Sequence, residues 1–142
     1  MSEMSISIRP ATPADFPKIA AVEAKANADD PGFTIGFPST AALETVFLNR
    51  LPFYHRHPHY QLLVAVTAED EVVGNLIAKG TAKDGSFVEK WEPKLPEGSN
   101  LKFFEYYFGL VSKQKKESGV EGLAGMSVFL CAAFKLVCVM FP

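Results

Sequence analysis

The sequence predicts a partial α/β domain in which helices pack on a mixed, mainly antiparallel sheet. Two strand-like runs flank an acidic turn between Tyr60 and Lys79. Two segments with helical spacing of apolar residues precede this hairpin, and a short alternating segment precedes them. The resulting order of strand, helix, helix, strand and strand indicates a domain whose helices cover a sheet.

The hairpin from residue 60 to residue 79 is the predicted centre of that sheet. Its first run, Leu62 to Thr67, is apolar on both faces, whereas the next four residues, Ala-Glu-Asp-Glu, favour a turn. The second run, Val72 to Ile77, resumes the apolar pattern. Because a strand that is apolar on both faces belongs inside a covered sheet, we expect cover on both sides of this one.

One strand and one helix are predicted at the start of the chain. Ile6 to Arg9 alternates as a short strand does, and Pro10 stops it. A helix is expected from Thr12, which can cap free backbone amides, while Pro13 suits the first helical position and Asp15 favours the positive end of the helix dipole. Phe16 opens its apolar face.

A loop and a second helix are expected next. Residues 27–38 are rich in Gly, Pro and Asp, which predicts a loop. Apolar residues at helical spacing predict a helix from Ser39 or Thr40, with Pro52 ending it. The following segment, Pro-Phe-Tyr-His-Arg-His-Pro-His, is expected to be a loop that leads into the hairpin.

The amino-acid composition changes at two points in the second half of the chain. Residues 80–100 are polar and without a clear period, which predicts a surface insertion. Leu101 to Glu117 has helical spacing and should pack against another element. The last segment, residues 119–142, is an apolar tail with two charges, Glu121 and Lys135. We therefore divide the chain into residues 1–118 and this tail.

Composition excludes some classes of function. The chain has 142 residues, 48% of them apolar, and a formal net charge of -2. This charge gives no electrostatic basis for nucleic-acid binding. The N-terminus has no signal-peptide core, and two nearby cysteines, Cys131 and Cys138, are weak evidence for a disulfide framework. A cytoplasmic location is the expectation that follows.

Three stretches carry a resemblance to a known family. They are Ile8-Arg-Pro-Ala-Thr-Pro-Ala-Asp15, Leu63-Val-Ala-Val66 and Glu71-Val-Val-Gly74. Together they resemble the first half of a GNAT-type N-acetyltransferase. The segments Trp91 to Asn100 and Phe104 to Gly109 are similar to a variant common in filamentous fungi. The resemblance covers about residues 5 to 118.

The resemblance implies acetyl transfer from acetyl-CoA to a primary amine of a small molecule or peptide. In this family a loop of pattern Gln/Arg-x-x-Gly-x-Gly/Ala follows a fourth strand and opens a helix, where backbone amides bind the pyrophosphate of the cofactor. The amine attacks the thioester directly. A carboxylate or an ordered water takes its proton, and a Tyr after the cofactor helix often protonates the leaving thiolate.

The sequence departs from the family pattern after Lys116. Gly119, Gly122 and Ala124 match the glycine spacing of the pyrophosphate loop and are weak candidates for cofactor binding, but Gly119 stands where the family has Gln or Arg. No strand is predicted before them. The expected domain is therefore truncated before its acetyl-CoA-binding half, inactive as given, and without a counterpart of the Tyr. No catalytic residue is assigned.

Other candidate residues have a simpler interpretation as surface or core. His55, His57 and His59 lie close in sequence, but Arg56 and Pro58 favour a solvated loop over a metal site, and no metal site is predicted. The two cysteines have apolar neighbours, which favour inert thiols. The resemblance places the acceptor site near the loop between the first two helices. Its carboxylates either orient the amine or are solvated; they are Asp29, Asp30 and Glu44.

The apolar tail leaves alternative functions open. It is interpreted as a membrane tail anchor, as a core strand or helix, or as a segment not selected as part of the fold. No strand is predicted to pair with Val72–Ile77, so an unpaired edge and an uncovered apolar face are expected, and self-association through that edge follows. A non-catalytic associating chain and a tail-anchored membrane protein, although a membrane is the less expected partner, are thus the alternatives to an acetyltransferase.

Overall fold

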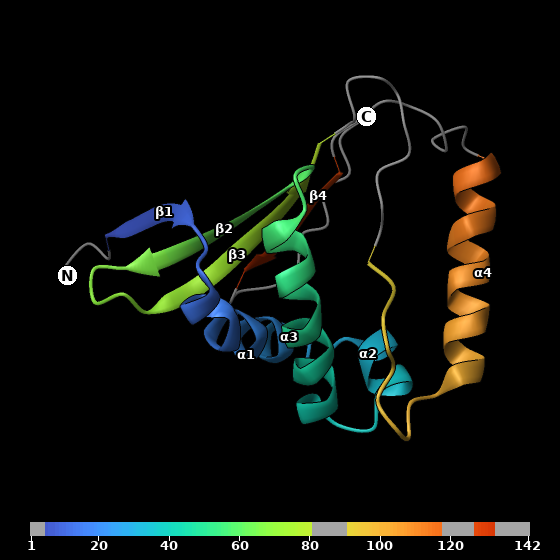
Figure 1. Cartoon of the computed structure of the whole chain (residues 1–142). Helices are drawn as coiled ribbons and strands as arrows, with labels where there is room; N and C mark the ends of the chain where they lie inside the picture. Colours follow the sequence, from blue (N-terminus) through green and yellow to red (C-terminus); the bar gives the residue numbers. More distant parts are fainter. Residues whose placement is uncertain (1–4, 81–90, 118–126, 133–142) are drawn as a thin grey trace.

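Four antiparallel strands form one sheet in the order β1-β2-β3-β4. The structure, a computed structural model, describes residues 5–80, 91–117 and 127–132 (Figure 1). The α/β class predicted from the sequence is confirmed. The strands are β1 (Ile6–Pro10), β2 (Tyr60–Thr67), β3 (Val72–Lys79) and β4 (Ser127–Ala132).

The predicted hairpin is confirmed as β2 and β3. Leu62 pairs with Ile77 and Val64 with Asn75, and the register shifts between Ala65 and Val66. The turn between the strands contains Asp70 at a positive φ of 61°, a left-handed conformation that aspartate tolerates better than most residues.

Two helices cover one face of the sheet. A short 3-10 turn, η1 (Pro13–Asp15), leads into α1 (Phe16–Ala26), and α3 (Thr40–Arg56) packs beside α1. Figure 1 shows both helices on the same side of the sheet. The core between them is apolar. Its buried members include Phe16, Ile19, Ala20, Ala24, Leu43, Phe47, Leu51, Leu62, Val64, Val66, Val72 and Ile77.

The expected cover on both faces is found on one face only among the described residues. The side chains that alternate with this core, Leu63, Ala65 and Leu76, are partly buried, and no described helix packs on them as α1 and α3 pack on the other face. Small and aliphatic residues occupy both faces of β2 and β3. Such a sequence predicts that both faces are apolar, but it does not predict which element covers each face.

Two sequence expectations about the helices are wrong. Residues 27–38 contain a helix, α2 (Pro31–Gly36), because Asp30 caps it and Pro31 suits its first position. Pro52 does not end α3, which continues to Arg56. The buried Leu51 lies at this turn of the helix, and packing of the apolar face outweighs the loss of one backbone hydrogen bond.

The expectation that β3 has no neighbour is also wrong. β4 pairs with β3 over six residues, from Gly74 opposite Ala132 to Lys79 opposite Ser127. The open edge therefore does not fall on β3. Of the three interpretations of the tail, a strand is the one observed for residues 127–132. Residues 119–126 and 133–142 lie outside the described part of the chain.

The helix predicted near the end of the chain is confirmed as α4 (Leu101–Glu117). It packs mainly against α2, and Figure 1 shows it apart from the sheet. Phe104 is its buried residue, and it contacts Gly36 and Phe37. Residues 91–100, which precede α4, contain no helix or strand. No helix in the described parts of the chain has the length and apolar character to cross a membrane.

Candidate functional site

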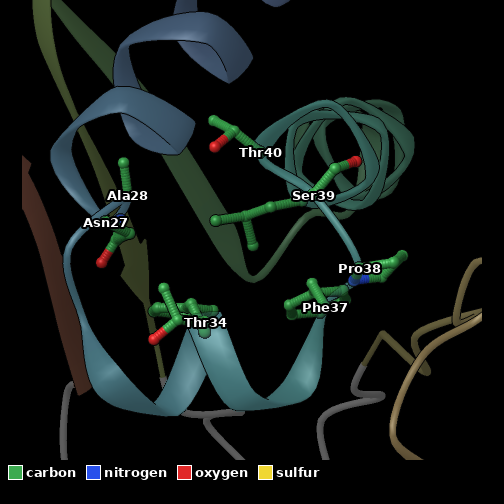
Figure 2. A pocket seen from close by; sticks show the side chains of 9 residues that line it. Asn27, Ala28, Thr34, Phe37, Pro38, Ser39 and Thr40 are labelled. Atoms are coloured by element: carbon green, nitrogen blue, oxygen red, sulfur yellow. The ribbon is translucent and has the colours of Figure 1, made fainter.

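A small pocket lies where α1 ends, α2 passes and α3 begins. We call it the α2 pocket. Its volume is about 170 Å³. Figure 2 shows Asn27 and Ala28 on one side of it, opposite Pro38 and Ser39. The lining residues are Asn27, Ala28, Phe33, Thr34, Phe37, Pro38, Ser39, Thr40 and Leu43.

Asn27 is the buried polar residue of this pocket. It caps the last turn of α1, since its Nδ2 donates to the carbonyl oxygen of Glu23 at 2.8 Å and its backbone N–H donates to the same oxygen at 3.1 Å. The amide nitrogen of Asn27 is thereby fixed. Its Oδ1 is then the group that remains to accept a hydrogen bond on the pocket side.

The rest of the lining combines hydroxyls with aromatic rings. Thr34 donates its hydroxyl to the backbone of α2, and Ser39 accepts from the N–H of Ala42 at 3.1 Å as the cap of α3. The rings of Phe33 and Phe37 stack with centroids 6.1 Å apart. No lysine or arginine is among the residues that line the pocket. This chemistry suits a neutral or cationic group better than a phosphate.

The three carboxylates proposed from the sequence do not line the pocket. Asp30 is the cap of α2 and accepts from the backbone N–H of Gly32 at 2.8 Å and of Phe33 at 3.3 Å. Asp29 is exposed, and Glu44 is partly buried on α3. Asp29 and Asp30 follow Ala28 directly, so they lend negative charge near the pocket rather than a contact inside it.

A buried ionic cluster lies one helical turn before Asn27, and sequence reasoning missed it. The carboxylate of Glu23, 0% exposed, accepts through Oε1 from Arg50 Nη2 at 2.7 Å and from Asn75 Nδ2 at 2.8 Å. These three residues come from α1, α3 and β3. The guanidinium of Arg50 also lies 4.6 Å from the ring centroid of Phe47.

The sequence did contain a signal for this cluster. Glu23 follows Ile19 by four residues on the apolar stripe of α1, and Asn75 interrupts an otherwise apolar strand. A polar residue on a stripe that faces the core needs a buried partner. Nearby, burial raises the pKa of the Tyr54 phenol, Glu23 raises it further, and Arg50 opposes both.

A second ionic group fixes the start of the chain against the hairpin. Arg9 donates to Asp15 through Nη1 at 2.8 Å and through Nη2 at 3.0 Å, and its Nη2 also donates to Asp70 at 3.0 Å. Asp15 Oδ2 accepts from the N–H and the hydroxyl of Thr12 as well. Arg9 holds the pKa of the Asp15 carboxyl well below its usual range, although burial acts the other way.

Two of the three histidines, His57 and His59, lie together, with ring centroids 5.7 Å apart, whereas His55 lies apart from them. His57 Nδ1 accepts from the N–H of His59 at 3.2 Å, and the ring of His55 packs edge-on against Phe16. Among the described residues, no group of His, Cys, Asp and Glu side chains is arranged to hold a metal ion. Cys131 stands opposite Asn75 in the register of β4 and β3.

The three candidates for cofactor binding lie outside the described residues. Gly119, Gly122 and Ala124 all fall between α4 and β4. Their position in the sequence differs from that of the pyrophosphate loop in the family. They precede β4, whereas the loop expected from the family resemblance follows a fourth strand. Cys138 also lies outside the described residues.

Part of the chain is similar to a solved structure. No family model and no curated protein matches the chain. A solved structure from Corynebacterium glutamicum, described as histone acetyltransferase HPA2 and related acetyltransferase, is 31% identical. The match covers 66% of this chain and 56% of that one, with a TM-score of 0.48. The chain thus spans little more than half the length of that protein.

Proposed function

We propose that this chain carries the first half of a GNAT-type N-acetyltransferase fold and that the α2 pocket receives the acceptor, a primary amine. The order of elements supports the proposal. β1, α1, α3, β2 and β3 come in the order that the family resemblance implies, with the short helix α2 between α1 and α3, and β1, β2 and β3 are antiparallel neighbours. The family-like segment from Ile8 to Asp15 is held in place by the pair between Arg9 and Asp15.

The position and the lining of the α2 pocket together support its assignment as the acceptor site. It lies at the end of α1, in the region where the resemblance places the acceptor. A primary ammonium group can donate to Asn27 Oδ1 and lie against the faces of Phe33 and Phe37. Asp29 and Asp30 attract a cation to the same end of the molecule.

Acetyl-CoA is the proposed acetyl donor, and the proposed reaction is direct attack of the amine nitrogen on the thioester carbonyl. The bound ammonium first loses one proton to solvent water and becomes the nucleophilic amine. The C–N bond then forms, the C–S bond breaks, and the second proton passes from nitrogen through water to the leaving thiolate. The lining of the α2 pocket lacks a cationic side chain, so the cofactor phosphates do not belong there. No residue is assigned to them.

The 142-residue chain by itself is proposed not to turn over acetyl-CoA. Its glycine pattern at 119–124 lacks the Gln or Arg of the family loop and precedes β4 instead of following it. In the family manner, the backbone amides that bind a pyrophosphate belong to a loop that follows a strand and opens a helix.

A binding assay and a turnover assay test the two parts separately. Calorimetric titration with aliphatic and aromatic primary amines should show binding, and the matching alcohols, which lack the charge, should bind at least tenfold more weakly. Mixing the chain with acetyl-CoA and the same amines should release no free thiol. Equal affinity for amines and alcohols would refute the acceptor pocket, and robust thiol release would refute the inactivity.

A matched pair of variants locates the binding. Ala28→Phe places a ring inside the α2 pocket and should abolish amine binding. Ala21→Phe places the same ring on the exposed face of α1 and should leave it unchanged. If both variants bind like the original chain, the amine binds elsewhere.

A further inference from the structure

The short helix α2 lines the α2 pocket and also forms the surface on which α4 packs. Phe33 and Phe37, which are four residues apart, belong to the lining of the pocket. Gly32 and Gly36 are also four residues apart, and they share a face of α2 that lies against aromatic rings of α4. Because a helix of six residues has little stability of its own, the position of α2 depends on the elements that pack against it.

A row of four phenylalanine rings runs from the core through the pocket wall to α4. The ring of Phe33 meets that of Phe47 on α3 edge-on, with centroids 5.8 Å apart, and it stacks on Phe37 at 6.1 Å. The ring of Phe37 in turn lies 5.1 Å from that of Phe104 on α4. Aromatic pairs at these distances attract each other. Phe33 is therefore held from the core, whereas Phe37 is held from α4.

The contact between α4 and α2 is close and specific. A Cβ at position 36 would lie 2.5 Å from Cζ of Phe104, so this approach requires the glycine that is found there. The N–H of Asn100 donates to the carbonyl oxygen of Gly36 at 2.8 Å, and the side-chain Oδ1 of Asn100 accepts from the N–H of Phe103 at 3.1 Å. Asn100 thus joins the end of α2 to the start of α4. Figure 1 shows α4 beside α2 and apart from the sheet.

We propose that Phe104 is a positioning residue for the amine: by holding the ring of Phe37, α4 sets the aromatic wall of the α2 pocket. The inference rests on the proposed function of this pocket as the acceptor site. Phe104 is 8% exposed and is not among the residues that line the pocket, so it acts through Phe37 and does not touch the amine.

The arrangement couples amine binding to the packing of α4. An ammonium group that lies against the faces of Phe33 and Phe37 binds well only while both rings are in place. Packing of Phe104 on Phe37 therefore favours binding. By linkage, an amine that binds this wall stabilises the packing of α4 on α2 by the same factor.

Calorimetric titration with benzylamine tests the first half of this coupling. Phe104→Ala should weaken binding by roughly tenfold, because one aromatic pair that holds the wall is lost. Phe104→Met, which keeps apolar bulk at the contact, should bind with an affinity between those of the original chain and Phe104→Ala. Tyr106→Ala is the matched control. It removes a ring from α4 at a position that is 69% exposed and should leave the affinity unchanged.

Hydrogen exchange tests the second half, with a readout that a purely structural role of Phe104 would not move. Benzylamine at about ten times its Kd should slow amide exchange in residues 104–108 by up to roughly tenfold, and Phe104→Ala should lose this effect. Absence of amine binding by the original chain overturns the acceptor pocket and this inference with it. If the original chain binds benzylamine, equal affinity in Phe104→Ala, or exchange in α4 that the amine leaves unchanged, overturns this inference alone.

Discussion

At the scale of single residues, ion pairs connect elements that are distant in the sequence. Arg9 and Asp15 were visible in the sequence only as a strand end and a favourable helix-dipole charge. The structure shows them as a two-bond ion pair that Asp70 extends to the hairpin turn. Propensity rules look a few residues along the chain, and the contact between Arg9 and Asp70 spans 61 positions. It could not be predicted from local pattern.

Asp15→Asn should destabilise the chain by about 1–3 kcal/mol, because it weakens the hydrogen bonds to Arg9 and Thr12 at a site with little access to water. Urea unfolding measures this. Asp29→Asn, at an exposed carboxylate close by, is the control and should change the free energy of unfolding by less than about 0.5 kcal/mol. Equal losses in both variants would contradict the role given to Asp15.

The same residue predicts a pH dependence of stability. Because Arg9 lowers the pKa of Asp15 in the folded state, the unfolded chain takes up the proton first as the pH falls. The stability that Asp15 contributes is present above its unfolded pKa of about 4 and is lost progressively below it. The difference in unfolding free energy between the original chain and Asp15→Asn should therefore shrink between about pH 5 and pH 2. A difference that is constant or grows in this range would contradict the ion pair.

The Glu23 cluster gives a further prediction at this scale. Glu23→Leu should cost about 3–5 kcal/mol, because it leaves the Arg50 charge without its buried partner. The double variant Glu23→Leu with Arg50→Met should recover much of this loss, since an apolar pair replaces the ionic one. Urea unfolding of the single and double variants decides it. Additive losses would show that the two residues do not act as a pair.

At the scale of elements, apolar periodicity predicted α1, α3, β2, β3 and α4 with small errors at their ends. The errors arose at prolines. Pro52 was expected to end α3, although tertiary packing of Leu51 maintains the helix through it. Asp30 and Pro31 together signal a helix start, yet the Gly-rich context favoured a loop. Tertiary packing maintains α3 through Pro52, and local capping by Asp30 starts α2.

The junction of α2 and α4 can be tested by two glycine substitutions. A Cβ at Gly36 would lie 2.5 Å from Cζ of Phe104, so Gly36→Ala should displace α4 and raise hydrogen exchange of its first turns. Gly109→Ala is the control on α4, where nothing lies within 4 Å. It should stabilise the helix by about 0.5–1 kcal/mol. Unchanged exchange in Gly36→Ala would contradict the contact between α2 and α4.

At the scale of the whole molecule, the sequence predicted three of the four strands in the sheet. β1, β2 and β3 followed from pattern, and β4 did not, because the apolar tail gives no alternation that separates a strand from a membrane segment. The candidate site was located through the family resemblance, which indicated the region after α1. Its actual lining, above all Asn27, required the structure, because a cap at a helix end is indistinguishable from loop polarity in the sequence.

The central claim is that the α2 pocket receives a primary amine, and amide chemical-shift mapping of the ¹⁵N-labelled chain tests it most directly. Titration with an aromatic primary amine should move the backbone signals of Asn27, Thr34 and Ser39 together and saturably. The signals of Thr45 and Asp70, which lie outside the pocket lining, should stay in place. Shifts that are absent from the pocket, or that occur equally throughout the sheet, would contradict the account.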